Sequence, residues 1–126
     1  MIVVNRFDHL VLTVADTEAT CDFYSRVLGM EVVRFEGRTA LKFGRQKINL
    51  HQQGHEIAPH ALKPTPGSAD LCLIVDTTLD EVEQSLRASK VSIEVGPIER
   101  TGATGKIRSI YVRDPDGNLI ELSQYV

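Results

Sequence analysis

The chain has 126 residues, a length that predicts one compact domain with a hydrophobic core of its own. Hydrophobic residues make up 42% and charged residues 25%, proportions typical of an ordinary globular protein. The net charge of −3, with basic residues scattered along the chain, argues against nucleic acid as a partner, and no apolar run reaches the ~18 residues needed to span a bilayer.

The N-terminal segment MIVVNRFDH has no charged region followed by a long apolar run and a small-residue cleavage site, so it does not read as a signal peptide. Cys21 and Cys72 show neither metal-ligand nor redox-motif spacing, which is typical of proteins in a reducing compartment. We therefore expect a cytoplasmic protein.

The first half of the chain, about residues 6–52, predicts a strand, a helix and three further strands. HLVLTV alternates apolar and polar residues, and the pattern then changes to a helical period with Asp16 or Thr17 as the N-cap and Gly29 as the stop. The runs EVVRFEG, RTALKFG and RQKINLHQ follow, separated by glycines, and predict a β-meander.

The same pattern returns over about residues 69–124. ADLCLIVDT predicts a strand, TTLDEVEQSLRAS a helix, and VSIEVGPIE, KIRSIYVRD and GNLIELSQ three more strands. Residues 53–68 between the halves are rich in proline and glycine and predict a linker without regular structure. A ferredoxin-like βαββαβ fold has too few strands to use this sequence, so we expect an α+β domain of two βαβββ repeats covering residues 1–126.

Aligning the halves places four polar residues at two pairs of equivalent positions. His9 lies over Asp70 at the start of each half's first strand, and His51 lies over Glu121 near the end of each half's last strand. Because side chains alternate across a strand, all four are expected to face away from the helices. Since a carboxylate is seldom buried without a partner, these positions predict a divalent cation held by histidines and carboxylates.

The DHLVLTVAD…FYSRVLGM opening and the SIYVRDPDGNLIEL ending resemble the vicinal oxygen chelate superfamily. This group includes glyoxalase I, bleomycin-resistance proteins, fosfomycin-resistance enzymes and extradiol dioxygenases, and the chain looks most like the small lactoylglutathione-lyase-like proteins with one glyoxalase domain. The resemblance implies a curved, U-shaped mixed sheet with helices on its outer face and one metal ion held between the two repeats.

Carried over residue by residue, the resemblance implies that His9, His51 and Glu121 bind one divalent metal ion, which could be Zn, Ni, Mn or Fe. His51 stands where glyoxalase I usually has a glutamate, and Asp70 stands where it usually has a histidine. The two middle ligand types are therefore exchanged. Asp70 could bind the metal directly, bind it through water, or merely cap the entry to its strand.

The activity implied by this resemblance is the isomerisation of a thiol–aldehyde adduct, such as a glutathione adduct, through an enediolate. Glu121 is the first candidate for the base and Asp70 the second. Three alternatives stay open: an extradiol-type dioxygenase, a thiol transferase, and a non-enzymatic small-molecule binding protein, because bleomycin-binding relatives keep the fold without a metal. The open edges of such a sheet, and the pairing of chains common in the family, predict a homodimer.

Overall fold

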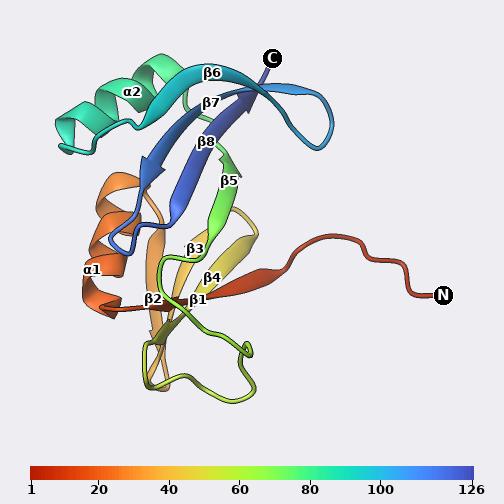
Figure 1. The fold of residues 1–126 in the computed structure, drawn as a ribbon, viewed down its shortest axis with the longest axis vertical. Coiled ribbons are helices and arrows are strands. Elements are labelled where there is room, and N and C mark those ends of the chain that lie inside the picture. Colours follow the sequence, from red (N-terminus) through yellow and green to blue (C-terminus); the bar gives the residue numbers. More distant parts are fainter. The chain divides into compact units, whose positions relative to one another are not determined.

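The computed structural model describes all residues from 1 to 126, which divide into two compact units, residues 1–66 and 67–126 (Figure 1). Each unit contains one βαβββ repeat, so the predicted α+β fold of two such repeats is confirmed. The boundary between the units falls inside the predicted linker. No helix in the structure combines the length and the apolar character that crossing a bilayer would require.

The first unit contains one mixed four-stranded sheet, here called sheet A, with the strand order β1-β4-β3-β2. β1 and β4 run parallel, and the other neighbours run antiparallel. The elements are β1 (His9–Val14), α1 (Thr17–Asp22), the π-helical turn η1 (Phe23–Val27), β2 (Glu31–Phe35), β3 (Arg38–Phe43) and β4 (Gln46–Gln52).

The second unit repeats this arrangement in sheet B, with the order β5-β8-β7-β6 and a parallel β5–β8 pair. Sheet A and sheet B therefore have the same topology. The elements are β5 (Asp70–Ile74), α2 (Leu79–Ala88), β6 (Val95–Thr101), β7 (Lys106–Arg113) and β8 (Leu119–Tyr125).

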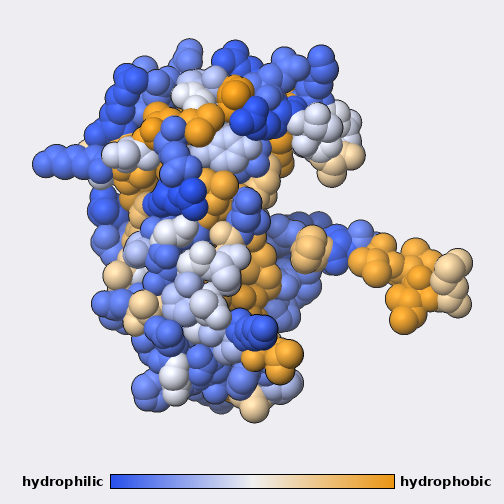
Figure 2. Space-filling model, viewed as in Figure 1, coloured by the Kyte–Doolittle hydropathy of each residue, from blue (hydrophilic) through white to orange (hydrophobic).

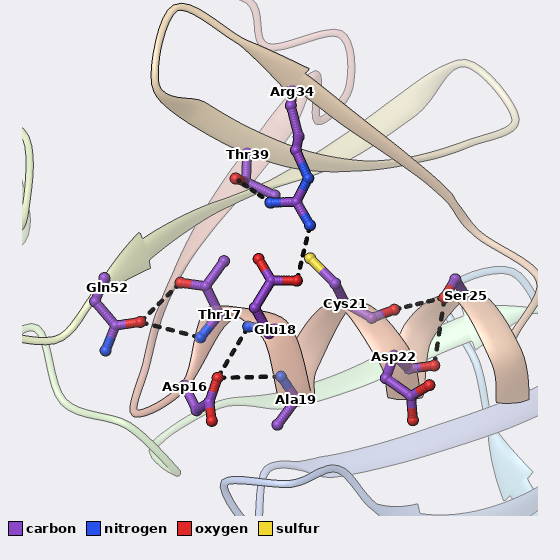
Figure 3. Close-up of polar contacts among 10 residues, drawn as sticks. All are labelled: Asp16, Thr17, Glu18, Ala19, Cys21, Asp22, Ser25, Arg34, Thr39 and Gln52. Carbon is purple, nitrogen blue, oxygen red and sulfur yellow. Dashed lines mark hydrogen bonds and ion pairs between the residues drawn. The ribbon is translucent and has the colours of Figure 1, made fainter.

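The predicted N-cap of the first helix is Asp16, whose side chain accepts hydrogen bonds from the backbone N–H groups of Glu18 and Ala19 (Figure 3). Gln52 at the end of β4 accepts from the Thr17 backbone at 3.0 Å and from the Thr17 hydroxyl at 2.9 Å. These bonds join the start of the helix to sheet A.

The first helix differs from a regular α-helix in its second half, which forms the π-helical turn η1. Phe23 and Tyr24 in this turn are both buried and meet edge to face, with ring centroids 5.3 Å apart. Gly29 follows with φ at +69°, a left-handed conformation that glycine adopts without strain, so its predicted role as the stop is confirmed.

The predicted strand over residues 91–99 is shifted, because β6 begins at Val95 and continues to Thr101. Its pairing with β7 slips between Val95 and Ile98, where Gly96 and Pro97 form an irregularity in the strand. An apolar and polar alternation alone does not locate such a bulge. The remaining strands lie where the sequence patterns predict them.

Residues 1–8 form an extended arm before β1, without helix or strand (Figure 1). Ile2, Val3 and Val4 are 89%, 85% and 83% exposed, and the tip of the arm stands out as an apolar projection (Figure 2). The carbonyl of Phe7 accepts a hydrogen bond from the Gln46 side chain at 3.3 Å, which joins the base of the arm to β4.

Candidate functional site

The predicted site residues lie on the face of each sheet that is opposite its buried apolar side chains. Ile48 and Leu50 of β4 are buried, so His51, an odd number of residues away from each, faces the other way. Ile120 and Leu122 flank Glu121 in the same manner in β8. The face predicted from strand alternation is therefore confirmed, and we call it the open face of each sheet.

The strand registers correct the alignment of the two repeats. In sheet A, His9 pairs with Lys47 and Val11 with Asn49. In sheet B, Asp70 pairs with Leu119 and Cys72 with Glu121. The residue equivalent to Glu121 is therefore Asn49, and the predicted equivalence of Glu121 with His51 is wrong by two positions.

Each sheet consequently presents two polar residues in a diagonal arrangement on its open face. The first residue is on the first strand of the repeat. The second is on the neighbouring strand, two positions after the residue that pairs with the first. The pairs are His9 with Asn49 in sheet A and Asp70 with Glu121 in sheet B. His51 pairs with Thr13 and lies four positions beyond the partner of His9, roughly 13 Å along the strand at a rise of about 3.3 Å per residue.

A local signal in the sequence could have identified Asn49. Ile48-Asn49-Leu50 matches Ile120-Glu121-Leu122 at both apolar positions, whereas the alignment with His51 places Leu50 over Ile120 and leaves Ile48 over Asn118, a polar residue.

The imidazole of His9 has one ring nitrogen occupied. Its Nδ1 lies 2.8 Å from a carboxylate oxygen of Asp8, and this contact lowers the pKa of Asp8. A carboxylate on one nitrogen of a histidine orients the ring and leaves Nε2 available, as is usual for metal-binding histidines. His51 is half-buried, and its Nδ1 is buried without a hydrogen-bond partner.

Glu121 is half-buried on the open face of sheet B and takes part in none of the protein's ion pairs. Its Oε2 atom accepts a 2.6 Å hydrogen bond from the hydroxyl of Ser109 in β7. The neighbouring hydroxyl of Ser123 lies 2.7 Å from that of Ser109. This carboxylate is thus held by neutral donors rather than by a cation.

Tyr111 is the ladder partner of Glu121 on β7 and also lies on the open face. Its hydroxyl accepts a hydrogen bond from Nε of Arg100 at 3.2 Å, and that guanidinium lies over the ring, 5.7 Å from the centroid. Burial raises the pKa of Tyr111, the hydrogen bond from Arg100 opposes this shift, and a hydrogen bond with Glu121 and the charge of Glu121 both add to it.

The turn before β8 positions Glu121 relative to β5. Asp114 accepts hydrogen bonds from the backbone of Asp116 and Asn118, both at 2.9 Å, and from the Asn118 side chain at 2.8 Å. The buried Asn118 side chain in turn accepts from the backbone N–H of Ala69 at 2.8 Å. The DPDGN motif therefore ties the start of β8 to the start of β5, which carries Asp70.

Cys72 is the ladder partner of Glu121 on the β5 side, and its thiol is free. Its Sγ lies 3.4 Å from the Ser123 hydroxyl. Partial desolvation raises the pKa of Cys72, and the charges of Glu121 and Asp70 act in the same direction against the Ser123 hydrogen bond. Within neither unit do three metal-binding side chains converge.

Residues 6–122 match the family described as Glyoxalase/Bleomycin resistance protein/Dioxygenase superfamily, which is nearly the whole chain. The chain belongs to this superfamily. The family predicted from the DPDGNLIEL and FYSRVLGM motifs is therefore confirmed, and its fold agrees with the paired βαβββ units.

Relatives within the superfamily share most of the chain. Virulence protein STM3117 of Salmonella typhimurium is 58% identical over 98% of this chain and 87% of its own length, and its crystal structure superposes with a TM-score of 0.97, covering 99% of this chain and 100% of that one. Glyoxalase domain-containing protein RDO1 of Mycosarcoma maydis is 54% identical over 97% of this chain and 69% of its own length. Lactoylglutathione lyase of Escherichia coli O157:H7 is 29% identical over 93% and 90% of the two chains.

Proposed function

We propose that the protein is a metal-dependent enzyme that isomerises a thiol–aldehyde adduct, in the manner of glyoxalase I. The observation that carries the proposal is the pair of equivalent diagonals on the open faces. One diagonal contains His9 and the other contains Asp70 and Glu121, an imidazole and two carboxylates at positions related by the internal repeat. The lactoylglutathione lyase relative supports this reaction class.

The residues present fit a divalent cation such as Zn, Ni, Mn or Fe. His9 keeps Nε2 available, the Glu121 carboxylate has no cationic partner, and the buried Nδ1 of His51 lacks a partner altogether. Nitrogen and oxygen ligands of this kind accept several first-row metals. When bound, such an ion supplies polarisation of the substrate carbonyl and stabilises negative charge on the neighbouring oxygens.

Glu121 performs the proton transfer in this proposal. It removes the proton from the carbon that bears sulfur and hydroxyl and returns it to the adjacent carbonyl carbon, while the hydroxyl proton passes to the former carbonyl oxygen. A hemithioacetal thereby becomes a hydroxy thioester with no net change in atoms. The half-buried site favours a base held in one orientation. Asp70 lies on the same open face, is more exposed, and is the second candidate for the base.

The proposal is tested by metal content and turnover. We expect about one divalent ion per site in the purified protein, and loss of that ion in His9→Ala. With methylglyoxal and glutathione, Glu121→Gln should form thioester about 10²- to 10⁴-fold more slowly, because it keeps the shape of the side chain but removes the base. Equal rates for the two proteins, or no turnover with Ni²⁺, Zn²⁺, Mn²⁺ or Fe²⁺, would refute the isomerase.

The metal ligand that β4 contributes is tested separately, because two residues of this strand are candidates for that role. His51 is the ligand predicted from the sequence, and its unpartnered Nδ1 supports that role, whereas the strand register favours Asn49. If His51 binds the metal, His51→Ala should release it and Asn49→Ala should retain it. The reverse result would assign this position to Asn49.

A second candidate function is small-molecule binding without chemistry. The observation that favours it is Asn49, a neutral amide at the position equivalent to the Glu121 carboxylate, which weakens the attraction of the site for a cation. A purified protein without stoichiometric metal that still binds a thiol adduct by calorimetry would support the binding protein over the enzyme.

A further inference from the structure

A row of three side chains with hydrogen-bonding groups leads across sheet B to the Glu121 carboxylate. Ser109 and Ser123 are ladder partners, and both are 0% exposed. The Ser109 hydroxyl is 2.6 Å from Oε2 of Glu121, the two serine hydroxyls are 2.7 Å apart, and the Cys72 thiol is 3.4 Å from the Ser123 hydroxyl. The row therefore joins three adjacent strands, β5, β8 and β7.

The number of hydrogens on each group decides which group donates in each of these hydrogen bonds. Each hydroxyl carries one hydrogen, and an ionised carboxylate only accepts. Ser109 therefore donates to Glu121, Ser123 donates to Ser109, and the Cys72 thiol is left to donate to Ser123. The contact from Ser123 to Oε2 is 3.4 Å, too long to compete with its 2.7 Å bond to Ser109.

The row occupies only one oxygen of Glu121. Both serines approach Oε2, while Oε1 accepts from neither of them. A hydrogen bond to an ionised acceptor is among the stronger bonds in proteins, so the short contact from Ser109 restricts rotation of the carboxylate. Ser109 and Ser123 lie on the same face of sheet B as Glu121, and Oε2 is the oxygen that contacts them, which leaves Oε1 without a hydrogen bond from either serine.

We propose that Ser109 and Ser123 are positioning residues that hold Glu121 through Oε2 and present Oε1 alone to the metal or to a proton of the substrate. The part of this inference that concerns metal and substrate rests on the proposed function. The arrangement of the row can be tested without either. A purely structural role for the serines predicts a loss of stability with no effect on what Glu121 binds.

The first experiment uses the metal-free protein. A buried hydroxyl in a 2.6 Å bond exchanges slowly with water, so the Ser109 hydroxyl proton should be visible by NMR in the native protein. In Glu121→Gln its signal should move, because the charged acceptor becomes neutral. A Ser109 hydroxyl that exchanges too fast to detect, or a signal that Glu121→Gln leaves in place, would overturn the inference whatever the metal content.

The second experiment measures affinity for Zn²⁺ and Mn²⁺ by calorimetry. Ser109→Ala should weaken binding by about 10- to 100-fold, the usual effect of losing a residue that orients a ligand. Ser123→Ala should weaken it less, because Ser123 acts through Ser109. The double variant should be no weaker than Ser109→Ala, since both changes interrupt one row. Ser109→Thr, which keeps the hydroxyl, should retain most of the affinity.

Ser25→Ala is the matched control, because it removes a hydroxyl that donates a 2.6 Å hydrogen bond to the Cys21 carbonyl in the other unit. Its affinity for metal should be that of the native protein even if its stability falls. Native affinity in a folded Ser109→Ala protein would overturn the positioning role. A native protein that binds no metal would refute the proposed function instead, and the NMR measurement would still decide the inference.

Discussion

Asp16 shows how one side chain determines where a helix begins. Its carboxylate accepts from two backbone N–H groups in the first turn of α1, which would otherwise lack partners. The preceding strand β1 carries His9, and α1 packs against β4, which carries Asn49 and His51. A single cap therefore contributes to the order of the sheet that presents the first half of the candidate site.

Replacing Asp16 with alanine should destabilise the protein by about 0.5–2 kcal/mol, because two N–H groups lose their acceptor. Urea unfolding measures the change. Asp22→Ala is the control, since the Asp22 side chain makes an exposed ion pair with Arg26 at 3.3 Å, and exposed pairs contribute little. Asp16→Asn, which keeps an acceptor, should lie close to the native protein. An unchanged midpoint in Asp16→Ala would contradict the capping role.

At the scale of elements, the irregular strand β6 is built around Gly96. This residue has φ at +108°, and a Cβ atom on it would overlap the backbone carbonyl oxygen of Ser109. The close approach is possible only for glycine, and it brings the β6 backbone against the strand that carries Ser109 and Tyr111. The shift in pairing between Val95 and Ile98 therefore depends on the glycine at position 96.

Gly96→Ala should destabilise the protein more than Gly44→Ala does. Both glycines have positive φ, but a Cβ at Gly44 would meet open space, so Gly44→Ala carries only the backbone strain of about 1–2 kcal/mol. Gly96→Ala adds the overlap with the carbonyl, a further cost of about 1–3 kcal/mol. Thermal unfolding of the two variants measures the difference. Equal stabilities would show that the β6 backbone moves away from the Ser109 carbonyl without loss of stability.

At the scale of the whole molecule, the extended arm and the open sheet edges favour association with another protein chain. Ile2, Val3 and Val4 are almost entirely exposed, and apolar groups of this kind usually mark an interaction surface. β1, which the arm leads into, is an edge strand of sheet A with one unpaired side. A second copy of this chain offers the same arm and the same edge, and so provides matching contacts for both.

We expect a homodimer at micromolar concentration, with the arm contributing to the interface. Val4→Asp should shift the protein toward monomer in sedimentation velocity, because it places a charge in an apolar contact. Leu62→Asp is the matched control, since Leu62 is 94% exposed but lies in the connector between the units. A native protein that sediments as a monomer, or a Val4→Asp protein that remains fully dimeric, would contradict this expectation.

The sequence by itself determined the local features of this protein. The repeat of strand, helix and three strands, the cap at Asp16, the stop at Gly29 and the outward direction of His9 and Glu121 all follow from patterns within about ten residues. Such patterns are sufficient because helix and strand periods and the preferences of capping residues act between near neighbours in the chain.

Only the tertiary structure decided which residues lie beside one another. Sliding β4 by two positions along β1 keeps every apolar side chain on the buried face, so alternation alone does not distinguish Asn49 from His51 as the equivalent of Glu121. The match of Ile48-Asn49-Leu50 with Ile120-Glu121-Leu122 favours Asn49, and the strand pairing establishes it. The same is true of the row from Cys72 through Ser123 and Ser109 to Glu121, whose members come from three strands. Their proximity depends on backbone hydrogen bonds between strands distant in the sequence, which set the register.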